Sequence, residues 1–180
     1  PVDGTPFDFK MARKIGEHKV IDDADILESL AGDESHCKRS VPDIAVRATC
    51  ADDIAKTLAL AERFEVPVTP RGGGTGKAGG AIPIFGGVVI DTSRMNRIEE
   101  IRARDLTAIV EPGCVLGDFH KAVEEEGLFY PPDPNSLETC CLGGNAAHNA
   151  GGPRAFKYGV TREYVRGLDA VLMGGKSILR

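Results

Sequence analysis

A long apolar run is absent from this 180-residue chain. No stretch approaches the roughly 18 residues that a membrane-spanning helix needs, and no secretory signal is visible. An excess of basic residues is absent too, because 22 lysines and arginines face 27 aspartates and glutamates, which gives a net charge of −5. Nucleic-acid binding usually shows as clustered positive charge. We therefore expect no membrane span and no nucleic-acid partner.

Paired cysteine motifs are also absent. The five cysteines form no CxxC spacing, which is typical of free thiols in a reducing compartment rather than of a disulfide framework. Cys140 and Cys141 are adjacent, and adjacent cysteines rarely close a relaxed disulfide, so we interpret them as packing residues. His36, Cys37 and Cys50 are too sparse for a metal site. These observations predict a cytoplasmic protein without a bound metal.

A catalytic constellation is the last feature that the sequence lacks. No Ser/His/Asp or Cys/His arrangement stands out, so hydrolysis has no support and no catalytic residue is identified. Glu124, Glu125 and Glu126 are best interpreted as a solvated helix end.

The stretch that organises the chain is residues 67–80, PVTPRGGGTGKAGG. It is a short apolar strand followed by a loop that is mostly glycine. Glycine can turn through positive φ and can approach a ligand closely. Successive backbone N–H groups in such a loop can form a nest for an anion. We therefore predict a pyrophosphate cradle, with a flexible linker as the alternative.

Two known phosphate motifs do not fit this loop. A P-loop needs glycine where Arg71 stands and a hydroxyl residue where Ala78 stands. The pattern GxGxxG occurs at 74–79, but it should open a helix, and the residues that follow, 80–83 (GAIP), propagate a helix poorly. Asp91 also comes too early to contact a ribose. The cradle would therefore be of another kind.

The hydrophobic pattern around the loop predicts a parallel α/β unit. Residues 44–48 and 66–69 indicate strands, and between them 51–64 has the apolar periodicity of an amphipathic helix, with Thr49 as a candidate cap. The glycine loop then lies at the carboxyl end of the second strand, where open α/β sheets generally bind ligands. The remaining predicted elements are helices at 7–20, 24–31 and 115–126, strands at 87–91 and 108–113, and a hairpin over 165–179.

A second loop-like stretch covers residues 133–152, DPNSLETCCLGGNAAHNAGG. Small residues alternate there with amide and hydroxyl groups. Two such stretches suit a long polar ligand that is held at more than one place. Within this stretch His148 could face the ligand or could be a loop residue with a solvent or backbone partner.

The motifs occur together in the order seen in one family. They are residues 71–76 (RGGGTG), 93–96 (SRMN), 111–113 (EPG), 132–134 (PDP), 143–145 (GGN), 149–152 (NAGG) and 157–159 (KYG). From about residue 42 to residue 180 the chain resembles the FAD-binding domain of the p-cresol methylhydroxylase/vanillyl-alcohol oxidase superfamily. Within it, the chain is most similar to the D-lactate dehydrogenase and glycolate oxidase flavoproteins.

The resemblance implies FAD as the cofactor and assigns its contacts. The first loop would bind the pyrophosphate through backbone N–H groups, and the second would approach the pyrophosphate and the flavin ring. Some members tether FAD through a histidine where Thr75 stands here, so the resemblance implies non-covalent FAD. The implied FAD-binding residues are Pro70, Arg71, Gly72, Gly73, Gly74, Thr75, Gly76, Ser136, Cys141, Gly143, Gly144, Asn145, Asn149, Ala150 and Gly151.

The chain departs from the family pattern at two places. Lys77 and Ala78 replace a common Leu-Ser pair, and Cys141 stands where a small hydroxyl residue is usual. A thiol donates a weaker hydrogen bond than a hydroxyl, which would loosen one contact.

The implied fold class is α+β, with a small parallel α/β lobe and an antiparallel-sheet lobe. We expect a helical extension at 1–40, the small FAD-binding lobe at 41–100, and a second, incomplete lobe at 101–180. Family members continue with further strands and a substrate-capping domain that carries the substrate residues. We therefore expect residues 1–180 to be a truncated, inactive part of the enzyme.

The implied function is oxidation of a D-2-hydroxy acid such as D-lactate or glycolate. Electrons would leave to a quinone, a cytochrome, an iron–sulfur partner or oxygen, with the protein cytoplasmic or peripheral at the inner membrane through a partner. Peptidoglycan-precursor reductases and the flavin subunits of molybdenum hydroxylases are rivals within the same fold. The alternative of another class is a non-catalytic flavin- or nucleotide-binding module that acts through a partner chain.

Overall fold

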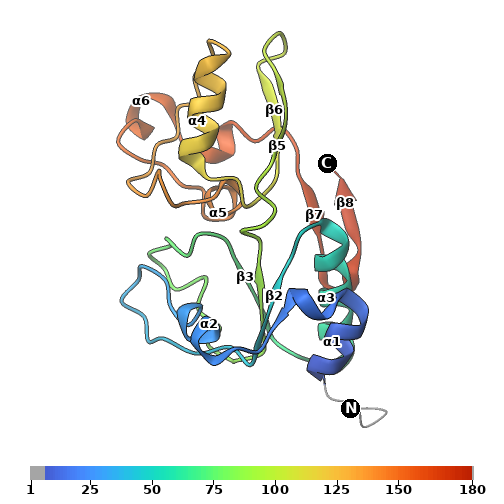
Figure 1. The fold of residues 1–180 in the computed structure, drawn as a ribbon. Helices are drawn as coiled ribbons and strands as arrows, with labels where there is room; N and C mark the ends of the chain where they lie inside the picture. Colours follow the sequence, from blue (N-terminus) through green and yellow to red (C-terminus); the bar gives the residue numbers. More distant parts are fainter. Residues whose placement is uncertain (1–6, 180) are drawn as a thin grey trace.

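The structure is a computed structural model that describes residues 7–179. Its elements form two lobes, drawn one above the other in Figure 1. The lower lobe contains a four-stranded sheet, and the upper lobe contains a hairpin and short helices. The chain is thus a mixed α+β fold with one mainly parallel sheet and separate antiparallel hairpins, which confirms the predicted fold class.

The lower sheet has the strand order β1-β2-β4-β3. Strands β2 (Ile44–Arg47), β4 (Val88–Asp91) and β3 (Val68–Arg71) are parallel, and β1 (Val20–Ile21) joins the edge of β2 in the antiparallel sense. All four residues of β4 are buried, as the nearly continuous apolar run at 87–91 predicts for a central parallel strand.

Helix α3 (Ala51–Phe64) connects β2 to β3 and has the bounds that its periodicity predicts. Its N-cap is Cys50 rather than Thr49, and no side chain caps the helix. Thr49 instead donates from its backbone N and its Oγ1 to Oδ2 of Asp53, each at 2.9 Å. The helix ends at Glu65, which takes a left-handed φ of 52°.

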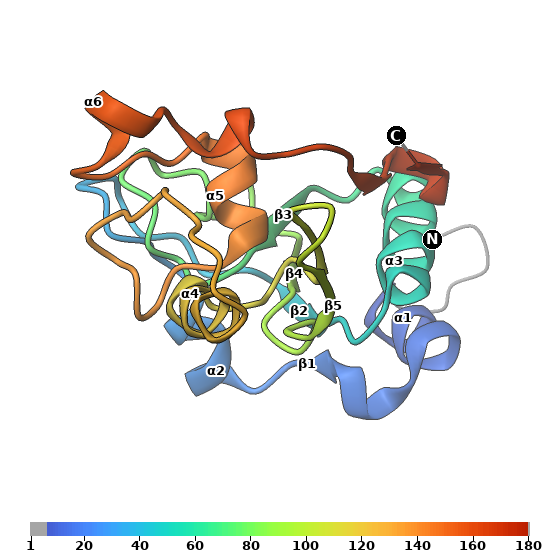
Figure 2. The same ribbon diagram turned by 90° about the horizontal axis from the view of Figure 1, so that it is seen from above.

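Helices cover both faces of the sheet, as Figure 2 shows. Val46, Val88 and Ile90 belong to one buried cluster with α3 and α1 (Phe7–Ile15). The alternate side chains Ala45 and Val89 belong to a second cluster with Leu27 of α2 (Ala24–Ser29). This division follows from the alternation of side chains along a strand.

The N-terminal segment is more closely integrated than a helical extension would need to be. After α1 comes a 3-10 helix, η1 (Glu17–Lys19), and then β1, which no sequence pattern indicated. Lys19 contributes a bidentate ion pair to Asp53 of α3, with Nζ–Oδ distances of 2.9 and 2.8 Å. Asp23 caps α2 by accepting from the backbone N of Asp25 and of Ile26.

The upper lobe is built on the antiparallel hairpin of β5 (Ile98–Arg102) and β6 (Thr107–Val110). The sequence pattern predicted only the second of these strands. The lobe's core combines Cys114, Leu116, Phe119, Val123 and Cys140. Its helices are α4 (Leu116–Glu125), α5 (Leu142–His148), α6 (Ala155–Tyr158) and the 3-10 helix η2 (Thr161–Glu163).

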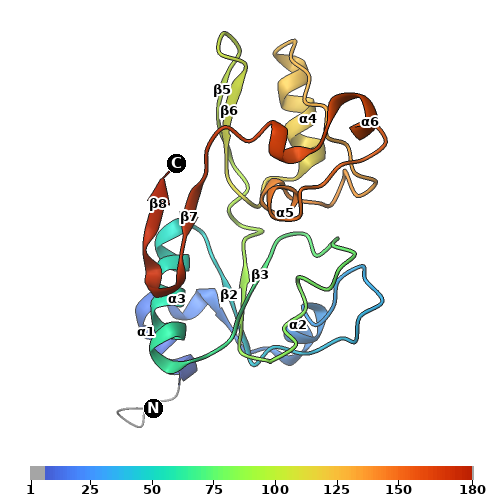
Figure 3. The same cartoon turned by 180° about the vertical axis from the view of Figure 1, so that it is seen from behind.

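The last hairpin returns to the lower lobe. Strands β7 (Asp169–Val171) and β8 (Ser177–Leu179) pair through η3 (Met173–Gly175), and the hairpin lies beside α3 in the views from front and back (Figures 1 and 3). The contact is close, because a Cβ on Gly175 would stand 3.3 Å from Cβ of Ala59. Among residues 7–179, no helix is long and apolar enough to cross a membrane.

Candidate functional site

The first glycine loop begins at the carboxyl ends of the parallel strands. Arg47, Asp91 and Arg71 are the register partners that end β2, β4 and β3. The loop's start is anchored because Thr92 donates from its backbone N and its Oγ1 to the carbonyl oxygen of Arg71, at 3.0 and 3.1 Å. Residues 72–80 then cross this edge of the sheet, where open α/β sheets bind ligands.

The side chain of Arg71 lies beneath its own loop. Its Nη1 donates to the carbonyl oxygen of Gly32 at 2.7 Å. Gly74 has a φ of +68°, and a Cβ there would stand 2.7 Å from Cζ of Arg71. The left-handed backbone favours glycine at position 74, and the Arg71 guanidinium lies where a Cβ would stand.

The second loop contains a short helix that the sequence analysis did not predict. Val115 and Cys141 form an antiparallel bridge, and α5 starts at the next residue. Its first two amides are already paired, since Leu142 N donates to Cys114 O and Gly143 N donates to Pro112 O, at 2.9 and 2.8 Å. Gly143 packs against Pro112, because a Cβ added to Gly143 would stand 2.6 Å from Cβ of Pro112.

The structure brings the two loops into contact. A Cβ on Gly72 would stand 3.3 Å from Cβ of Cys141, and one on Gly73 would overlap the carbonyl oxygen of Thr139. The ring of His148, at the end of α5, lies 3.1 Å from the position of a Cβ on Gly80. His148, although exposed, therefore lies against the first loop. Thr139 and Gly80 are contact residues within the two stretches that were not among the implied FAD-binding residues.

Several donors at this junction have no protein acceptor among the described residues. They are the backbone N–H groups of Gly74, Thr75, Gly76 and Gly144 and the side-chain Nδ2 of Asn145, which is buried. Buried polar groups such as Asn145 Nδ2 are normally paired, and successive backbone amides in a glycine-rich loop can form an anion nest. A pyrophosphate offers several acceptor oxygens, so the residues present fit such a group.

Asn149 and Ala150 follow α5 and pin the second loop to η2. Asn149 has a left-handed φ of 51°, and its Oδ1 accepts from the backbone N of Arg162 at 3.0 Å. The carbonyl oxygen of Ala150 accepts from the N and the Oγ1 of Thr161.

The two remaining predicted residues of this loop have structural contacts. Gly151 packs near Val160. The carbonyl oxygen of Ser136 closes the turn before α5 by accepting from the backbone N of Thr139 and of Cys140.

Two buried cysteines of the upper lobe, Cys141 at the junction and Cys114 in the core, are not reactive thiolates. Burial raises the pKa of Cys141, although the backbone N–H of Gly73 points to its sulfur and opposes the shift. Burial likewise raises the pKa of Cys114 to about 11. Both thiols therefore stay protonated near neutral pH, and their environment is that of packing residues.

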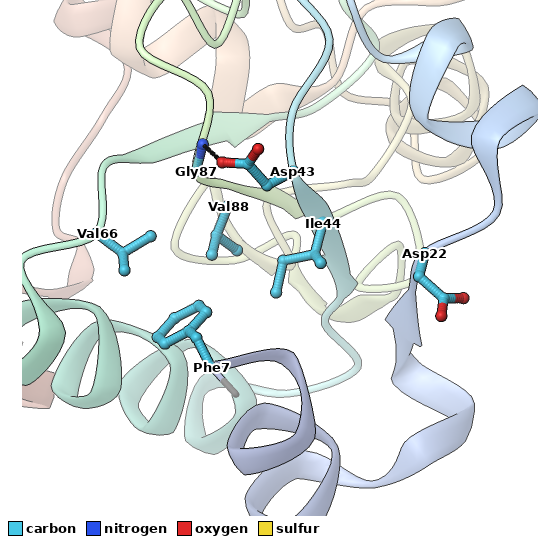
Figure 4. Close-up of a pocket in the computed structure, with 7 residues that line it drawn as sticks. All are labelled: Phe7, Asp22, Asp43, Ile44, Val66, Gly87 and Val88. Carbon is cyan, nitrogen blue, oxygen red and sulfur yellow. Dashed lines mark hydrogen bonds between the residues drawn. The ribbon is translucent and has the colours of Figure 1, made fainter. Parts of the chain in front are cut away.

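A pocket of about 360 Å³ lies elsewhere in the lower lobe (Figure 4). Phe7, Ile44 and Val88 give it an apolar lining, and Asp43 at its rim accepts from the backbone N of Gly87 at 2.6 Å. It lies at the amino ends of the parallel strands, opposite the glycine loop. It is therefore separate from the site described here.

Solved structures with this fold define the class of protein. The chain is similar to alkyldihydroxyacetonephosphate synthase, with a TM-score of 0.86 at 22% identity, over 97% of this chain and 37% of that one. It is also similar to p-cresol methylhydroxylase with substrate bound, with a TM-score of 0.81 at 22% identity, over 96% of this chain and 34% of that one. The fold is therefore the two-lobed, p-cresol methylhydroxylase-type FAD-binding fold. A synthase and a methylhydroxylase share it, so the fold alone does not determine the reaction.

The sequence match then gives the family: residues 42–178 match the FAD binding domain family, and the chain belongs to it. The chain is 46% identical to glycolate oxidase subunit GlcD of Bacillus subtilis (strain 168) over 140 residues, 78% of this chain and 30% of that protein. It is 37% identical to D-lactate dehydrogenase of Anaerostipes hadrus over 175 residues, 97% of this chain and 37% of that protein. It is 32% identical to mitochondrial D-2-hydroxyglutarate dehydrogenase of Bos taurus over 181 residues, 97% of this chain and 33% of that protein.

These matches establish FAD as the cofactor. The chain spans about a third of the length of the curated relatives that it matches.

Proposed function

We propose that this chain is the FAD-binding portion of an FAD-linked oxidoreductase that oxidises a D-2-hydroxy acid such as D-lactate or glycolate. The observation that carries the proposal is the contact between the two glycine-rich loops, which gathers amide donors without protein acceptors at one place. The names of the relatives point to hydroxy acids as the substrate class.

The proposed role of this chain is to bind and orient FAD, which supplies the hydride-accepting chemistry when bound. The amides of Gly74, Thr75, Gly76 and Gly144 donate to pyrophosphate oxygens. Asn145 Nδ2 donates from the buried side of α5. Such fixed dipoles need no reorganisation when the cofactor arrives, because the contacts of Gly73 and Gly143 already hold the backbone in place.

Non-covalent attachment is part of this proposal, because Thr75 offers no nucleophilic ring nitrogen. Acid precipitation of the full-length protein should leave the flavin in the supernatant. Flavin that stays with the precipitate would contradict non-covalent binding.

Further protein completes the proposed enzyme, either as the rest of the chain or as an electron-transfer partner. A groove of about 480 Å³ lies beside the last hairpin and is lined by Val165, Leu168, Ala170 and Ile178. Leu168 in this groove is 54% exposed, and an apolar groove of this kind favours a protein neighbour.

The test uses the full-length protein with its FAD. Under anaerobic conditions, the flavin should be bleached by at least one of glycolate, D-lactate and D-2-hydroxyglutarate, and not by L-lactate. Bleaching by glycolate or by a D-acid, without bleaching by L-lactate, would support the proposal. A protein that binds FAD and is bleached by none of these acids would contradict it and favour the non-catalytic module.

A further inference from the structure

A segment outside the matched family region lies behind the first glycine loop. A Cβ on Gly79, which has a φ of +78°, would stand 3.0 Å from Sγ of Cys37, and one on Gly76 would stand 3.7 Å from Oδ2 of Asp33. Both neighbours belong to the connection between α2 and β2, before residue 42 where the family match begins. The glycine loop therefore has a support that the family region does not contain.

Asp33 is the polar centre of this support. Its Oδ1 accepts from the backbone N of Ser35 at 2.9 Å. Its Oδ2 is buried and meets no donor at full hydrogen-bond geometry among the described residues. The backbone N–H groups of Gly79 and Ala81 nevertheless lie close enough to act on the carboxylate. Burial raises the pKa of Asp33, but hydrogen bonds from Ser35 and from these two amides outweigh burial and lower it.

Arg71 forms the other half of the support. Its Nη1 donates to Gly32 O at 2.7 Å and lies 3.5 Å from Ala81 O, so one guanidinium connects the segment before Asp33 to the end of the glycine loop. Burial lowers the pKa of Arg71, and the charges of Asp33 and Asp91 oppose that shift. The charge of the guanidinium thus interacts with that of Asp33 and offsets the carboxylate's charge near an anion site.

We propose that Asp33 is a positioning residue for the FAD pyrophosphate loop, acting through Gly79, Ala81 and Arg71 rather than by touching FAD. The carboxylate lies beside the backbone of Gly76, Gly79 and Ala81, and Arg71 connects the end of the loop to Gly32. The amides of residues 74–76 make no backbone hydrogen bond among the described residues and are left for a ligand. A glycine-rich loop has many backbone conformations, so fixing it before binding lowers the entropic cost of binding.

The inference rests on the FAD site proposed above, and its test needs no substrate. The full-length protein is prepared without flavin as wild type and as Asp33→Asn, and FAD affinity is measured by flavin fluorescence. Asp33→Asn should weaken FAD binding about tenfold, because it removes the charge of a carboxylate that accepts hydrogen bonds. Hydrogen exchange in FAD-free peptides that cover residues 70–82 should become faster.

Asp23→Asn is the matched control. Asp23 lies in the same N-terminal segment and caps α2, but the structure shows no contact between it and the glycine loop among the described residues. This variant should keep FAD affinity within about twofold of wild type and should leave exchange of residues 70–82 unchanged. Ser35→Ala removes the hydroxyl that hydrogen-bonds Asp33 and that accepts from the backbone N of Cys37 at 3.1 Å. It should weaken FAD binding in the same direction and by less.

Wild-type FAD affinity and unchanged exchange in Asp33→Asn would overturn the proposal. An equal loss in Asp23→Asn would overturn it too, because the effect would then belong to the segment's stability. If Asp33→Asn does not fold, the FAD affinity of Ser35→Ala decides the question. Normal affinity in that variant would contradict the positioning role of Asp33. A protein that meets these expectations but oxidises no hydroxy acid would leave the inference standing while the proposed substrate class fails.

Discussion

Gly73 and Thr139 are in backbone contact across the two glycine-rich loops. A Cβ on Gly73 would overlap the carbonyl oxygen of Thr139 and would stand 3.4 Å from Cα of Cys140. The oxygen is held in place because the turn of Thr139 is closed by hydrogen bonds to Ser136 O from Thr139 N and Cys140 N, at 2.9 and 2.7 Å. The two loops can therefore approach to backbone contact because residue 73 is a glycine, which has no side chain.

Gly73→Ala should therefore separate the loops. We expect FAD affinity to fall by more than about tenfold, because backbone cannot yield as the end of a flexible side chain can. The measurement is a fluorescence titration of flavin-free, full-length protein. Gly127→Ala is the control, since Gly127 has a φ of +72° but no neighbour within 4 Å of an added Cβ. It should cost about 1 kcal/mol of stability through strain and leave FAD binding unchanged.

Gly144→Ala should leave thermal stability equal or higher while it lowers FAD affinity. Nothing stands within 4 Å of a Cβ on Gly144, and alanine in a helix is about 0.5–1 kcal/mol more stable than glycine. The flavin-free protein should therefore unfold at an equal or higher temperature, while the added methyl group beside the free amide lowers FAD affinity. FAD affinity equal to that of wild type would remove Gly144 from the site.

Gly74→Val should reduce FAD affinity severely and leave the lower sheet folded. The valine would need a left-handed backbone, and its Cβ would meet the guanidinium of Arg71. Positive φ is a genuine outlier for β-branched residues. Far-ultraviolet circular dichroism should retain its native form while the flavin titration shows the loss. An unchanged titration would mean that the loop's conformation does not matter for binding.

Asp53 should make the lower lobe sensitive to acid. Burial raises the pKa of Asp53, but hydrogen bonds and charge from Lys19 and hydrogen bonds from Thr49 outweigh burial and lower it below 3.8. Its stabilising contribution is then complete above pH about 3.8 and is lost as the pH falls through the lowered pKa. Asp53→Asn should cost about 2 kcal/mol at pH 7, and this difference should shrink in strong acid.

The neighbouring Asp52 provides the control for Asp53. Its side chain is 65% exposed and pairs with Lys56 within α3. Asp52→Asn should change the free energy of unfolding by less than about 0.5 kcal/mol at pH 7, as is usual for exposed helix pairs. Urea denaturation of both variants across the acid range makes the comparison, and equal losses would show that burial of Asp53 contributes little.

The elements that were predicted correctly from the sequence are those with a clear apolar pattern, either helical periodicity or a continuous apolar run. Helix α3 has its predicted bounds, and β4 is buried as its apolar run indicates. By contrast, β1 has only two residues, which is too short for any periodicity. Helix α5 begins with Leu142, Gly143 and Gly144, and glycine disfavours helices. It exists because Gly143 fits against Pro112, a contact between residues far apart in the sequence.

The candidate site was likewise only partly predictable from the sequence. The resemblance to a family assigned the loop residues to FAD, but it said nothing about which residues hold the loops in place. Thr139 touches Gly73 through its carbonyl oxygen, a group that every residue has, so its side chain carries no signal. Asp33 reaches the loop from a connection before the family region. Such contacts depend on the tertiary fold and cannot be derived from local pattern.

The contact between the last hairpin and α3 affects when, during synthesis, the lower lobe can complete its folding. Helix α3 leaves the ribosome early, but Gly175, which lies against Ala55 and Ala59, is synthesised after the whole upper lobe. Until then the small-residue face of α3 has no hairpin beside it. Contacts of such large sequence separation form slowly, and incompletely covered surfaces favour aggregation during synthesis. The lower lobe should therefore reach its native protease resistance only after the hairpin has been translated.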